Sequence, residues 1–403
     1  MSPCHSTTAN NNHAFTTVMP GRIPHPPLED VLPPLVFGCA VFNHQYNPDP
    51  LALDTNGLVY KALSLGIRAF DTSPYYGPSE ELLGAALDNA RKEYPRDDYL
   101  ILTKVGRIGG EEFDYSPEWI RQSVKRSLQR MHTSYLDVVY CHDIEFVSDE
   151  ETVTAVKELR RIRDQEGTIK YVGISGYPLD VLCRLAERIL EETGEPLDAV
   201  MSYANFTLQN TTLLTEGVPR LKAAGVKVVP NASPLGMGLL RKVGPHSWHP
   251  GGDVLRKAVQ EASDFCEEHE DRIEVVATRY VLERWLCEGS EVGSRADPAA
   301  GVPFRRETVD QVGGGKLGIS VIGVSNDAEL TKAMQVWRSI LDGRETGKQV
   351  KAAGRWKKDH EWSLSRSKTV ELLAEGIQDI FGDLYNYAWP SPSEGYVNQH
   401  KKK

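Results

Sequence analysis

The order of apolar and amphipathic segments constrains the fold of this chain more than any other feature. Short, almost continuously apolar segments rich in β-branched residues alternate with longer stretches of helical periodicity, as expected for strands covered on both faces. From Pro34 onward, eight strands are predicted: Leu35–Val41, Ile67–Asp71, Tyr99–Lys104, Asp137–Cys141, Tyr171–Ser175, Ala199–Ser202, Val226–Asn231 and Ile319–Val324. The helices predicted between them include Ser116–Met131, Asp149–Gln165, Asp180–Glu192 and Asn326–Leu341.

This alternation predicts an α/β fold, a (β/α)8 TIM barrel with loop insertions and a C-terminal extension. The alternative is a doubly wound sheet, which needs a glycine-rich phosphate turn after its first strand. The segment at that place, Gly38–Asn43, lacks the G-x-G-x-x-G spacing. The barrel is therefore the favoured fold.

The chain divides into three predicted parts. Residues 1–32 are polar and proline-rich and are expected to form a flexible lead-in, residues 33–342 the barrel, and residues 343–403 a C-terminal extension. Insertions are expected near 243–253 and 289–316, and the second, glycine-rich one is interpreted as a flexible loop because it lacks the spacing of a phosphate loop. In the extension, a helical stretch at Thr369–Phe381 precedes Tyr385, Tyr387 and Trp389. These aromatic residues can pack on the bottom of the barrel or fold over its mouth, and the first arrangement is favoured.

Composition excludes several classes of partner. The 403 residues carry a net charge of −10, which argues against nucleic acid and anionic membrane surfaces. No apolar run is long enough for a transmembrane helix, the N-terminus lacks a signal-peptide pattern, and the six cysteines are scattered, so a cytoplasmic location is expected. No metal site is predicted, because the close pair His246 and His249 has no nearby set of carboxylates.

Four side chains that can carry out proton chemistry are predicted at the ends of three successive strands. Asp71 and Tyr76 follow the second strand, Lys104 ends the third and His142 follows the fourth. The carboxyl ends of parallel barrel strands form one rim, so these four side chains are expected to converge.

The residue types suggest distinct roles. A lysine after an apolar strand is partly desolvated and needs a counter-charge, which Asp71 supplies. A lysine held beside a phenol lowers the tyrosine pKa from about 10 toward neutral pH, so Tyr76 is a candidate acid and base. His142 is placed to hydrogen-bond a substrate oxygen. Each residue alone is more often structural than catalytic, but their joint placement favours catalysis.

The motifs around these residues resemble those of the aldo-keto reductases, from Pro34 to about Leu341. They are Asp71–Gly77 (DTSPYYG), Thr103-Lys104, His142-Asp143, Gly173–Gly176 (GISG) and Ser233–Leu240 (SPLGMGLL). The resemblance implies a barrel that binds a nicotinamide nucleotide without a Rossmann domain. It also implies that Tyr76 is the general acid/base, Lys104 lowers its pKa, Asp71 pairs with the lysine and His142 orients the substrate.

Further stretches, such as His142–Phe146 (HDIEF), resemble a branch of the family that contains the fungal NAD-dependent D-arabinose 1-dehydrogenases and, next, the plant L-galactose dehydrogenases. Three positions depart from the commoner family pattern. Gly176 stands where many members have asparagine, Ala232 stands where a tyrosine often stacks on nicotinamide, and Met201 or Ser202 stands in place of a glutamine. These departures match the sugar dehydrogenase branch, which is associated with erythroascorbate biosynthesis.

The resemblance implies NAD-dependent oxidation of an aldose at C1 to the aldonolactone, with D-arabinose, L-galactose, L-fucose and L-xylose as candidate substrates. The expected substrate contacts are Phe42, Asn43, Tyr76 and His142. The expected cofactor contacts are Gly38, Ser175, Ser202, Asn205, Ser233, Pro234, Leu235, Gly236, Met237, Gly323, Ser325 and Asn326. NAD is favoured over NADP, because Val324–Glu329 contains two acids and no cation that could pair with a 2′-phosphate.

Two other functions compete with this interpretation. One is an NADPH-dependent reductase of aldehydes or ketones, and the other is a cofactor-sensing regulatory subunit. The complete set of Asp71, Tyr76, Lys104 and His142 argues against the second. The sequence leads to no expectation for the oligomeric state.

Overall fold

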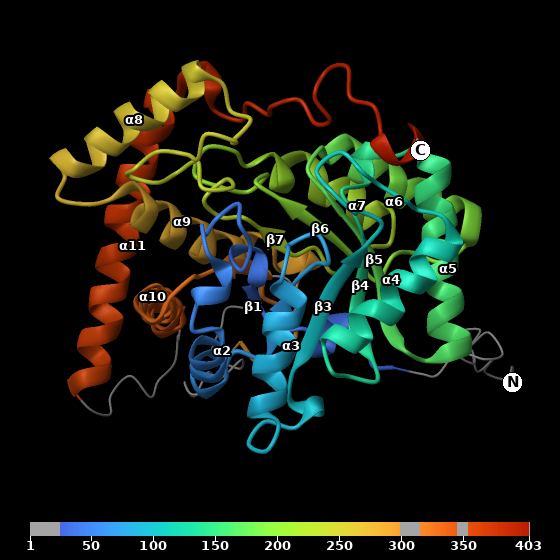
Figure 1. The fold of residues 1–403 in the computed structure, drawn as a ribbon. Helices are drawn as coiled ribbons and strands as arrows, with labels where there is room; N and C mark the ends of the chain where they lie inside the picture. The colour runs from blue at the N-terminus through green and yellow to red at the C-terminus, as the bar shows by residue number, and fades with distance from the viewer. Residues whose placement is uncertain (1–24, 299–314, 345–353, 403) are drawn as a thin grey trace, which may run out of the picture.

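Eight parallel strands form a closed barrel in the computed structural model, which describes residues 25–298, 315–344 and 354–402 (Figure 1). Each strand pairs with the next, and β8 pairs with β1 to close the barrel. The predicted (β/α)8 fold is therefore confirmed. The strands are β1 Leu35–Gly38, β2 Ala69–Asp71, β3 Leu100–Val105, β4 Leu136–His142, β5 Ile169–Gly176, β6 Ala199–Tyr203, β7 Asn231–Ala232 and β8 Ser320–Gly323.

Helices surround the barrel, as its sequence periodicity predicts. In the described residues they are α1 Leu28–Val31, α2 Thr55–Ser64, α3 Ser79–Ala90, α4 Pro117–Arg130, α5 Asp149–Glu166, α6 Leu179–Thr193, α7 Val218–Ala223, α8 Asp253–Glu268, α9 Ile273–Glu288, α10 Asp327–Arg344 and α11 Gly354–Phe381. Local signals set their ends. At α5, the Ser148 hydroxyl accepts from the backbone of Glu151 while the Glu151 carboxylate accepts from that of Ser148, and Gly167 ends the helix at φ 66°.

Side chains alternate between the two faces of each strand, and this alternation directs the polar residues of the rim toward the barrel interior. Ala69, Leu102 and Tyr140 belong to the cluster that fills the barrel interior. Side chains two positions apart on a strand share a face, so the next inward-facing residues are Asp71, Lys104 and His142. The barrel interior therefore ends, at its C-terminal end, in a layer of ionisable groups.

The seventh strand is shorter and later than the sequence predicts. Val226–Asn231 was the expected strand, but β7 consists of Asn231 and Ala232 alone. The preceding segment still runs beside β6, because Val228 and Pro230 accept hydrogen bonds from the backbone of Val200 and Ser202. Pro230 has no N–H to donate, so the ladder is interrupted there.

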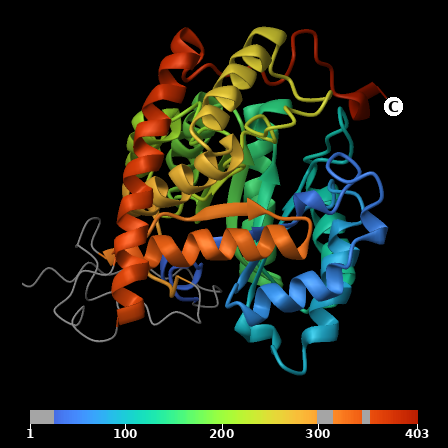
Figure 2. The same cartoon turned by 90° about the vertical axis from the view of Figure 1, so that its left-hand side faces the viewer.

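The C-terminal extension is joined to the barrel through a buried arginine. Helix α11 packs along α8, α9 and α10, as Figure 2 shows. Arg279 of α9, whose side chain is 2% exposed, donates to the hydroxyl of Ser339 on α10 at 3.0 Å. It also donates to the hydroxyls of Ser363 and Ser367 on α11 at 2.9 and 3.3 Å. One guanidinium thus links three helices.

After α11 the chain crosses the C-terminal end of the barrel, where it forms a strap of residues 384–399 (Figure 1). Gln209 Nε2 donates to the carbonyl oxygens of Leu384 and Tyr387 at 2.6 and 3.1 Å. At the far end, the Asn398 side chain forms two hydrogen bonds with the backbone of Phe113. The favoured expectation that the aromatic tail packs on the bottom of the barrel is therefore wrong.

Other predicted segments fall partly outside the described residues. This holds for residues 1–24 of the lead-in and for 299–314 of the second insertion, whereas residues 243–252 form a loop before α8. Within the described residues, no helix is long and apolar enough to cross a membrane.

Candidate active site

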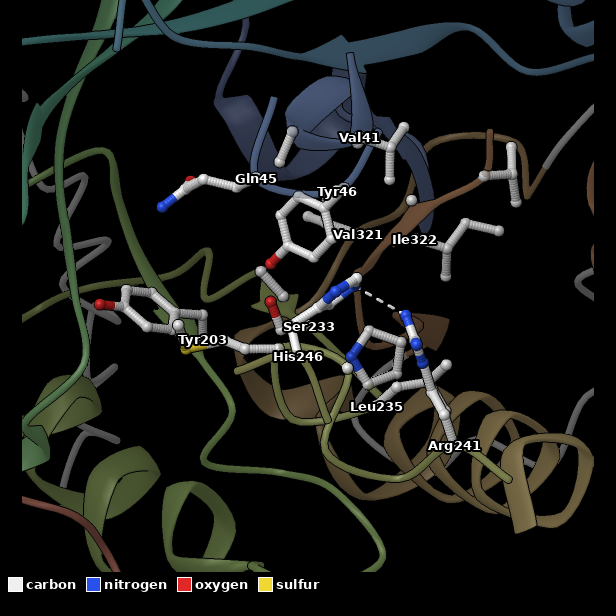
Figure 3. Close-up of a pocket in the computed structure, with 18 of the residues that line it drawn as sticks. Val41, Gln45, Tyr46, Tyr203, Ser233, Leu235, Arg241, His246, Val321 and Ile322 are labelled. Carbon is white, nitrogen blue, oxygen red and sulfur yellow. Dashed lines mark hydrogen bonds between the residues drawn. The ribbon is translucent and has the colours of Figure 1, made fainter. Parts of the chain in front are cut away.

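A cavity of about 1470 Å³ opens at the C-terminal end of the barrel. Its walls include the inward-facing last residues of several strands, Gly38, Asp71, Lys104, His142, Ser175, Tyr203 and Gly323. The loops after β1 and β7 form part of its rim (Figure 3). All four side chains predicted to carry out proton chemistry line this one cavity.

Lys104 and Asp71 form a buried ion pair at the floor of the cavity. Lys104 Nζ lies 2.8 and 2.7 Å from the two carboxylate oxygens of Asp71 and 2.9 Å from the carbonyl oxygen of Thr72. The three donors of the ammonium are therefore all used, which compensates for its burial.

Tyr76 lies next to this ion pair on the loop after β2. Its ring centroid is 4.9 Å from Lys104 Nζ. Burial, with added effects of the Asp71 and Asp143 charges, raises the pKa of Tyr76 well above its ordinary value. The sequence led us to expect the opposite shift. We attribute the difference to removal of the phenol from water, which disfavours the phenolate, and secondly to the negative charge of Asp71.

His142 contacts the Tyr76 ring edge-on, with ring centroids 5.6 Å apart. Burial lowers the pKa of His142 to about 3; Asp143 opposes this shift, and Lys104 and Arg107 add to it. The imidazole is therefore neutral at pH 7. Its Nδ1 lies 3.0 Å from the Ser73 hydroxyl oxygen, which already accepts a hydrogen bond from the backbone N–H of Tyr75.

A second ion pair, not predicted from the sequence, lines the cavity beside His142. Arg107 Nη1 donates to Asp143 Oδ2, and the guanidinium lies 3.8 Å from the centre of the Tyr75 ring. The sequence did contain a signal for this ion pair. Arg107 follows Lys104 by three positions and Asp143 follows His142 directly, so two opposite charges were expected near the same rim.

Aromatic side chains from two distant segments cover parts of the cavity. In the strap, Trp389 stacks on Tyr177 with ring centroids 4.6 Å apart and planes 5° apart. In the loop before α8, Trp248 Nε1 donates to the carbonyl oxygen of Gln45, and the Tyr46 ring lies edge-on to Trp248 at 5.4 Å. These residues were not identified as site residues from the sequence, because they approach the cavity only through long-range packing.

Most predicted cofactor contacts line the cavity, namely Gly38, Ser175, Ser233, Pro234, Leu235, Met237, Gly323, Ser325 and Asn326. Ser202, Asn205 and Gly236 do not belong to its wall and hold neighbouring loops instead. The Asn205 side chain donates to the Ser202 hydroxyl and the Tyr177 carbonyl at 2.9 and 2.6 Å, and the Gly236 carbonyl oxygen lies 2.9 Å from His249 Nε2.

The two predicted substrate contacts Phe42 and Asn43 also lie outside the cavity wall. Phe42 is fully buried in the core beside Phe37. The Asn43 side-chain oxygen accepts from the backbone of Gln45 and Tyr46 and so stabilises a turn. Both residues support the loop after β1 without facing the cavity.

One wall of the cavity fits the diphosphate of a dinucleotide. The loop after β7 contains several residues with left-handed backbone, among them Ser233, Gly236 and Met237, at φ 57°, 59° and 59°. Turns of this kind expose backbone N–H groups on one side, where they bind anions. Arg241 adds a positive charge to this wall and donates to His246 Nε2 at 2.8 Å (Figure 3).

The segment after β8 is acidic and internally hydrogen-bonded. The backbone N–H of Ser325 donates to Glu329 Oε2 at 2.7 Å, and the backbone N–H of Glu329 donates to the Asn326 side chain at 2.9 Å. Asp327 forms an ion pair with Lys61. Glu329 itself belongs to the cavity wall.

Comparison with known proteins agrees with this geometry. The model of the aldo/keto reductase family matches residues 34–351, a range that includes all eight strands. The chain belongs to the aldo/keto reductase family. The resemblance inferred from the motifs is thereby confirmed, and the protein is an oxidoreductase.

Three curated relatives are aldose or sugar dehydrogenases by name. D-arabinose 1-dehydrogenase from Saccharomyces cerevisiae is 47% identical over 261 residues, which are 64% of this chain and 78% of the relative. L-galactose dehydrogenase from Arabidopsis thaliana is 40% identical over 235 residues, 57% and 70% of the two chains. D-threo-aldose 1-dehydrogenase from a Pseudomonas species is 27% identical over 263 residues, 58% and 76% of the two chains.

Two departures from the common aldo/keto reductase pattern have a structural explanation. A Cβ at Gly176 would lie 2.6 Å from Glu145 Oε2, so a side chain such as asparagine collides with the buried glutamate. Ala232 pairs with Tyr203 of β6, and both residues line the cavity. An aromatic ring is thus present on the neighbouring strand, although the seventh strand lacks one.

Proposed function

We propose that this protein oxidises an aldose at C1 to the aldonolactone, with NAD as the hydride acceptor and Tyr76 as the general base. The observation that carries the proposal is the cavity floor, where Lys104 is bound to both oxygens of Asp71 and lies against the Tyr76 ring. The aldose dehydrogenases among the relatives support a sugar as the substrate.

In the proposed step the substrate loses a hydride and a proton. A bound nicotinamide nucleotide would supply the acceptor for the hydride that leaves C1. The Tyr76 phenolate accepts the proton of the anomeric hydroxyl, and the C1–O bond becomes the lactone carbonyl. Lys104 stabilises the phenolate, and Asp71 keeps the lysine in position.

His142 positions the anomeric oxygen. The Ser73 hydroxyl oxygen accepts from Tyr75 N–H, so its own hydrogen is available for His142 Nδ1. This leaves Nε2 as the protonated nitrogen of the neutral imidazole, which donates a hydrogen bond to the anomeric oxygen. Such positioning is a large part of catalysis, because it removes the entropy cost of orienting the reactants.

NAD is the proposed cofactor because of the acidic segment after β8. Glu329 lies at the cavity wall and binds the backbone of Ser325, where a 2′-phosphate would be repelled. Free ribose hydroxyls, in contrast, can donate to the side chains of Glu329 and Asn326.

A second candidate function is the reverse reaction, reduction of a carbonyl compound. One observation favours it: the raised pKa of Tyr76 keeps the phenol protonated at neutral pH, as a proton donor requires. If aldose oxidation is the function, its rate should rise with pH into the alkaline range, because the basic form of Tyr76 becomes more populated.

Paired initial rates test the proposal. NAD is supplied with D-arabinose, L-galactose, L-fucose or L-xylose, and NADPH is supplied with simple aldehydes. We expect the highest kcat/KM for NAD with one of the four sugars and much lower values when NADP replaces NAD. Efficient NADPH-dependent reduction without measurable sugar oxidation would establish the reductase instead.

A further inference from the structure

Three tyrosine hydroxyls in the wall of the cavity have no partner in the described part of the chain. Five tyrosines line this cavity. The Tyr75 hydroxyl accepts a hydrogen bond from a neighbouring side chain at 3.5 Å, and the Tyr396 hydroxyl is buried. The hydroxyls of Tyr46, Tyr76 and Tyr203 form no hydrogen bond with the described residues and are not among the buried polar atoms. These three hydroxyls are therefore open to the cavity and available to a ligand.

The three open hydroxyls belong to different parts of the cavity. Tyr76 is the proposed base at the floor. Tyr46 lies on the side of the diphosphate wall, where the charge of Arg241 acts on its phenol. In Figure 3 the Tyr46 hydroxyl points toward Ser233, whereas the Tyr203 hydroxyl points away from Ser233 and Arg241. Tyr203 therefore faces the half of the cavity that lies opposite the diphosphate wall.

The charged groups around Tyr203 show that this is the half where the reacting carbon is held. Burial, with added effects of the Asp143 and Glu145 charges, raises the pKa of Tyr203 well above its ordinary value, while the Arg107 charge opposes this shift. The phenol therefore keeps its proton at neutral pH. Asp143 in turn lies 3.5 Å from Nε2 of His142, the nitrogen that positions the anomeric oxygen under the proposed function.

The ring of Tyr203 is held in place from one side. It is the last residue of β6, and its ring centroid lies 5.6 Å from that of Tyr177 with the planes 30° apart. Tyr177 is itself fixed by the strap, because Trp389 stacks on it and the backbone N–H of Trp389 donates to its hydroxyl at 3.2 Å. A hydroxyl that is fixed before the ligand arrives loses little entropy on binding.

We propose that the Tyr203 hydroxyl hydrogen-bonds a hydroxyl group of the sugar ring beyond C1 and so contributes to the choice of sugar. This inference rests on the proposed function and adds to it a residue that determines specificity. A sugar hydroxyl is the appropriate partner, because a protonated phenol can donate to it or accept from it. A site that hydrogen-bonds a substrate hydroxyl discriminates against analogues that lack it.

The test uses Tyr203→Phe, which removes the hydroxyl and keeps the ring. No hydrogen bond within the described residues is lost, so the midpoint of denaturant unfolding should stay unchanged. With saturating NAD, kcat/KM for D-arabinose should fall about 3- to 30-fold, as expected when a substrate hydroxyl loses its partner in a closed site. The dissociation constant of NAD, measured by fluorescence titration, should stay unchanged.

Deoxy sugars identify the contact. Wild type and Tyr203→Phe are compared on D-arabinose and on its three analogues that lack the hydroxyl on C2, C3 or C4. The loss caused by Tyr203→Phe should disappear for at least one analogue, the one without the contacted hydroxyl, and persist for the others. A general loss of activity cancels in this comparison, because it affects all four sugars alike.

Tyr140→Phe is the matched control. Tyr140 is an inward-facing tyrosine of β4 whose hydroxyl also lacks a partner among the described residues, but it is buried inside the barrel and does not belong to the cavity wall. The same atom is removed without a change in the wall. The relative values of kcat/KM for the four sugars should therefore stay as in the wild type.

The outcomes distinguish this inference from the function on which it rests. If the wild type oxidises none of the sugars with NAD, the proposed function fails and the inference fails with it. If the wild type oxidises D-arabinose but Tyr203→Phe affects all four sugars equally or not at all, the proposed function stands and the role of Tyr203 is overturned. Weaker binding of NAD together with an equal loss for all four sugars would assign the contact to the cofactor and also overturn it.

Discussion

The floor and the roof of the cavity are built in different ways. The floor consists of strand-end residues held by buried, short hydrogen bonds, such as those between Lys104 and Asp71. The roof consists of the strap and the loop before α8, which are held by aromatic stacking between segments distant in sequence, such as Trp389 on Tyr177. The difference suggests that the floor determines the chemistry of the reaction, whereas the roof adjusts which substrates reach it.

The largest expected effect comes from removing the proposed base of the floor. Tyr76→Phe should lower kcat for sugar oxidation about 10²- to 10⁴-fold, the range for loss of a general acid or base. NAD binding, measured by fluorescence titration, should stay within about twofold of the wild type. Near-normal turnover would show that the proton goes elsewhere and that the floor does not determine the chemistry.

Breaking the buried ion pair should affect both activity and stability. Lys104→Met leaves the Asp71 carboxylate buried without a partner, which costs about 3–5 kcal/mol of unfolding free energy. Turnover should fall about 10²-fold. In the double variant with Asp71→Asn, denaturant unfolding should recover much of the stability, while activity stays low. Recovery of activity together with stability would mean that the pair is only structural.

The junction of floor and roof should respond to pH through Glu145. This residue accepts from the Ser391 hydroxyl of the strap, and burial together with the Asp143 charge raises its pKa from 4.5 to about 8. The folded protein therefore binds this proton more tightly than the unfolded chain, so stability is lost as pH rises from about 4.5 to 8. The loss should be on the order of 2–5 kcal/mol.

Glu145→Gln removes this titration. Thermal unfolding of the variant between pH 5 and 8 should show a flatter dependence on pH than the wild type. Parallel profiles for the two proteins would indicate that Glu145 does not titrate in this range.

The smallest expected effect comes from the roof. Trp389→Ala removes one aromatic stack, worth about 0.5–1.5 kcal/mol, so KM for the sugar should rise about 2- to 10-fold with kcat within about twofold. Trp119→Ala is the matched control, because Trp119 lies on α4 outside the cavity wall. A fall in kcat as large as that of Tyr76→Phe would show that the roof, like the floor, determines the chemistry of the reaction.

The same distinction explains what the sequence could predict. The convergence of Asp71, Lys104 and His142 follows from two local rules, the parallel order of the strands and the alternation of their side chains. The position of Trp389 follows from no local rule, because it depends on contacts with residues about 200 positions earlier. The sign of the Tyr76 pKa shift was missed for a related reason, since it depends on how far the folded chain removes the phenol from water.

The seventh strand could be predicted from the sequence only in part. The apolar pattern correctly indicated a buried, extended segment at Val226–Asn231, and Val228 and Val229 are buried. Pro230 was visible in the sequence, but its effect on the hydrogen-bond ladder depends on the register with β6.

Arg279 has a consequence for how this protein could change in evolution. Its Nη2 donates to the Ser363 and Ser367 hydroxyls of α11, so loss of the C-terminal extension would remove these hydrogen bonds. The ion pair of its Nε with Glu283 on α9 and the hydrogen bond of Nη1 to α10 would remain. A shortened descendant would need a compensating substitution at this position. Exposed positions of the strap, such as Tyr387 and Val397, are not constrained in this way and can change while the barrel stays unchanged.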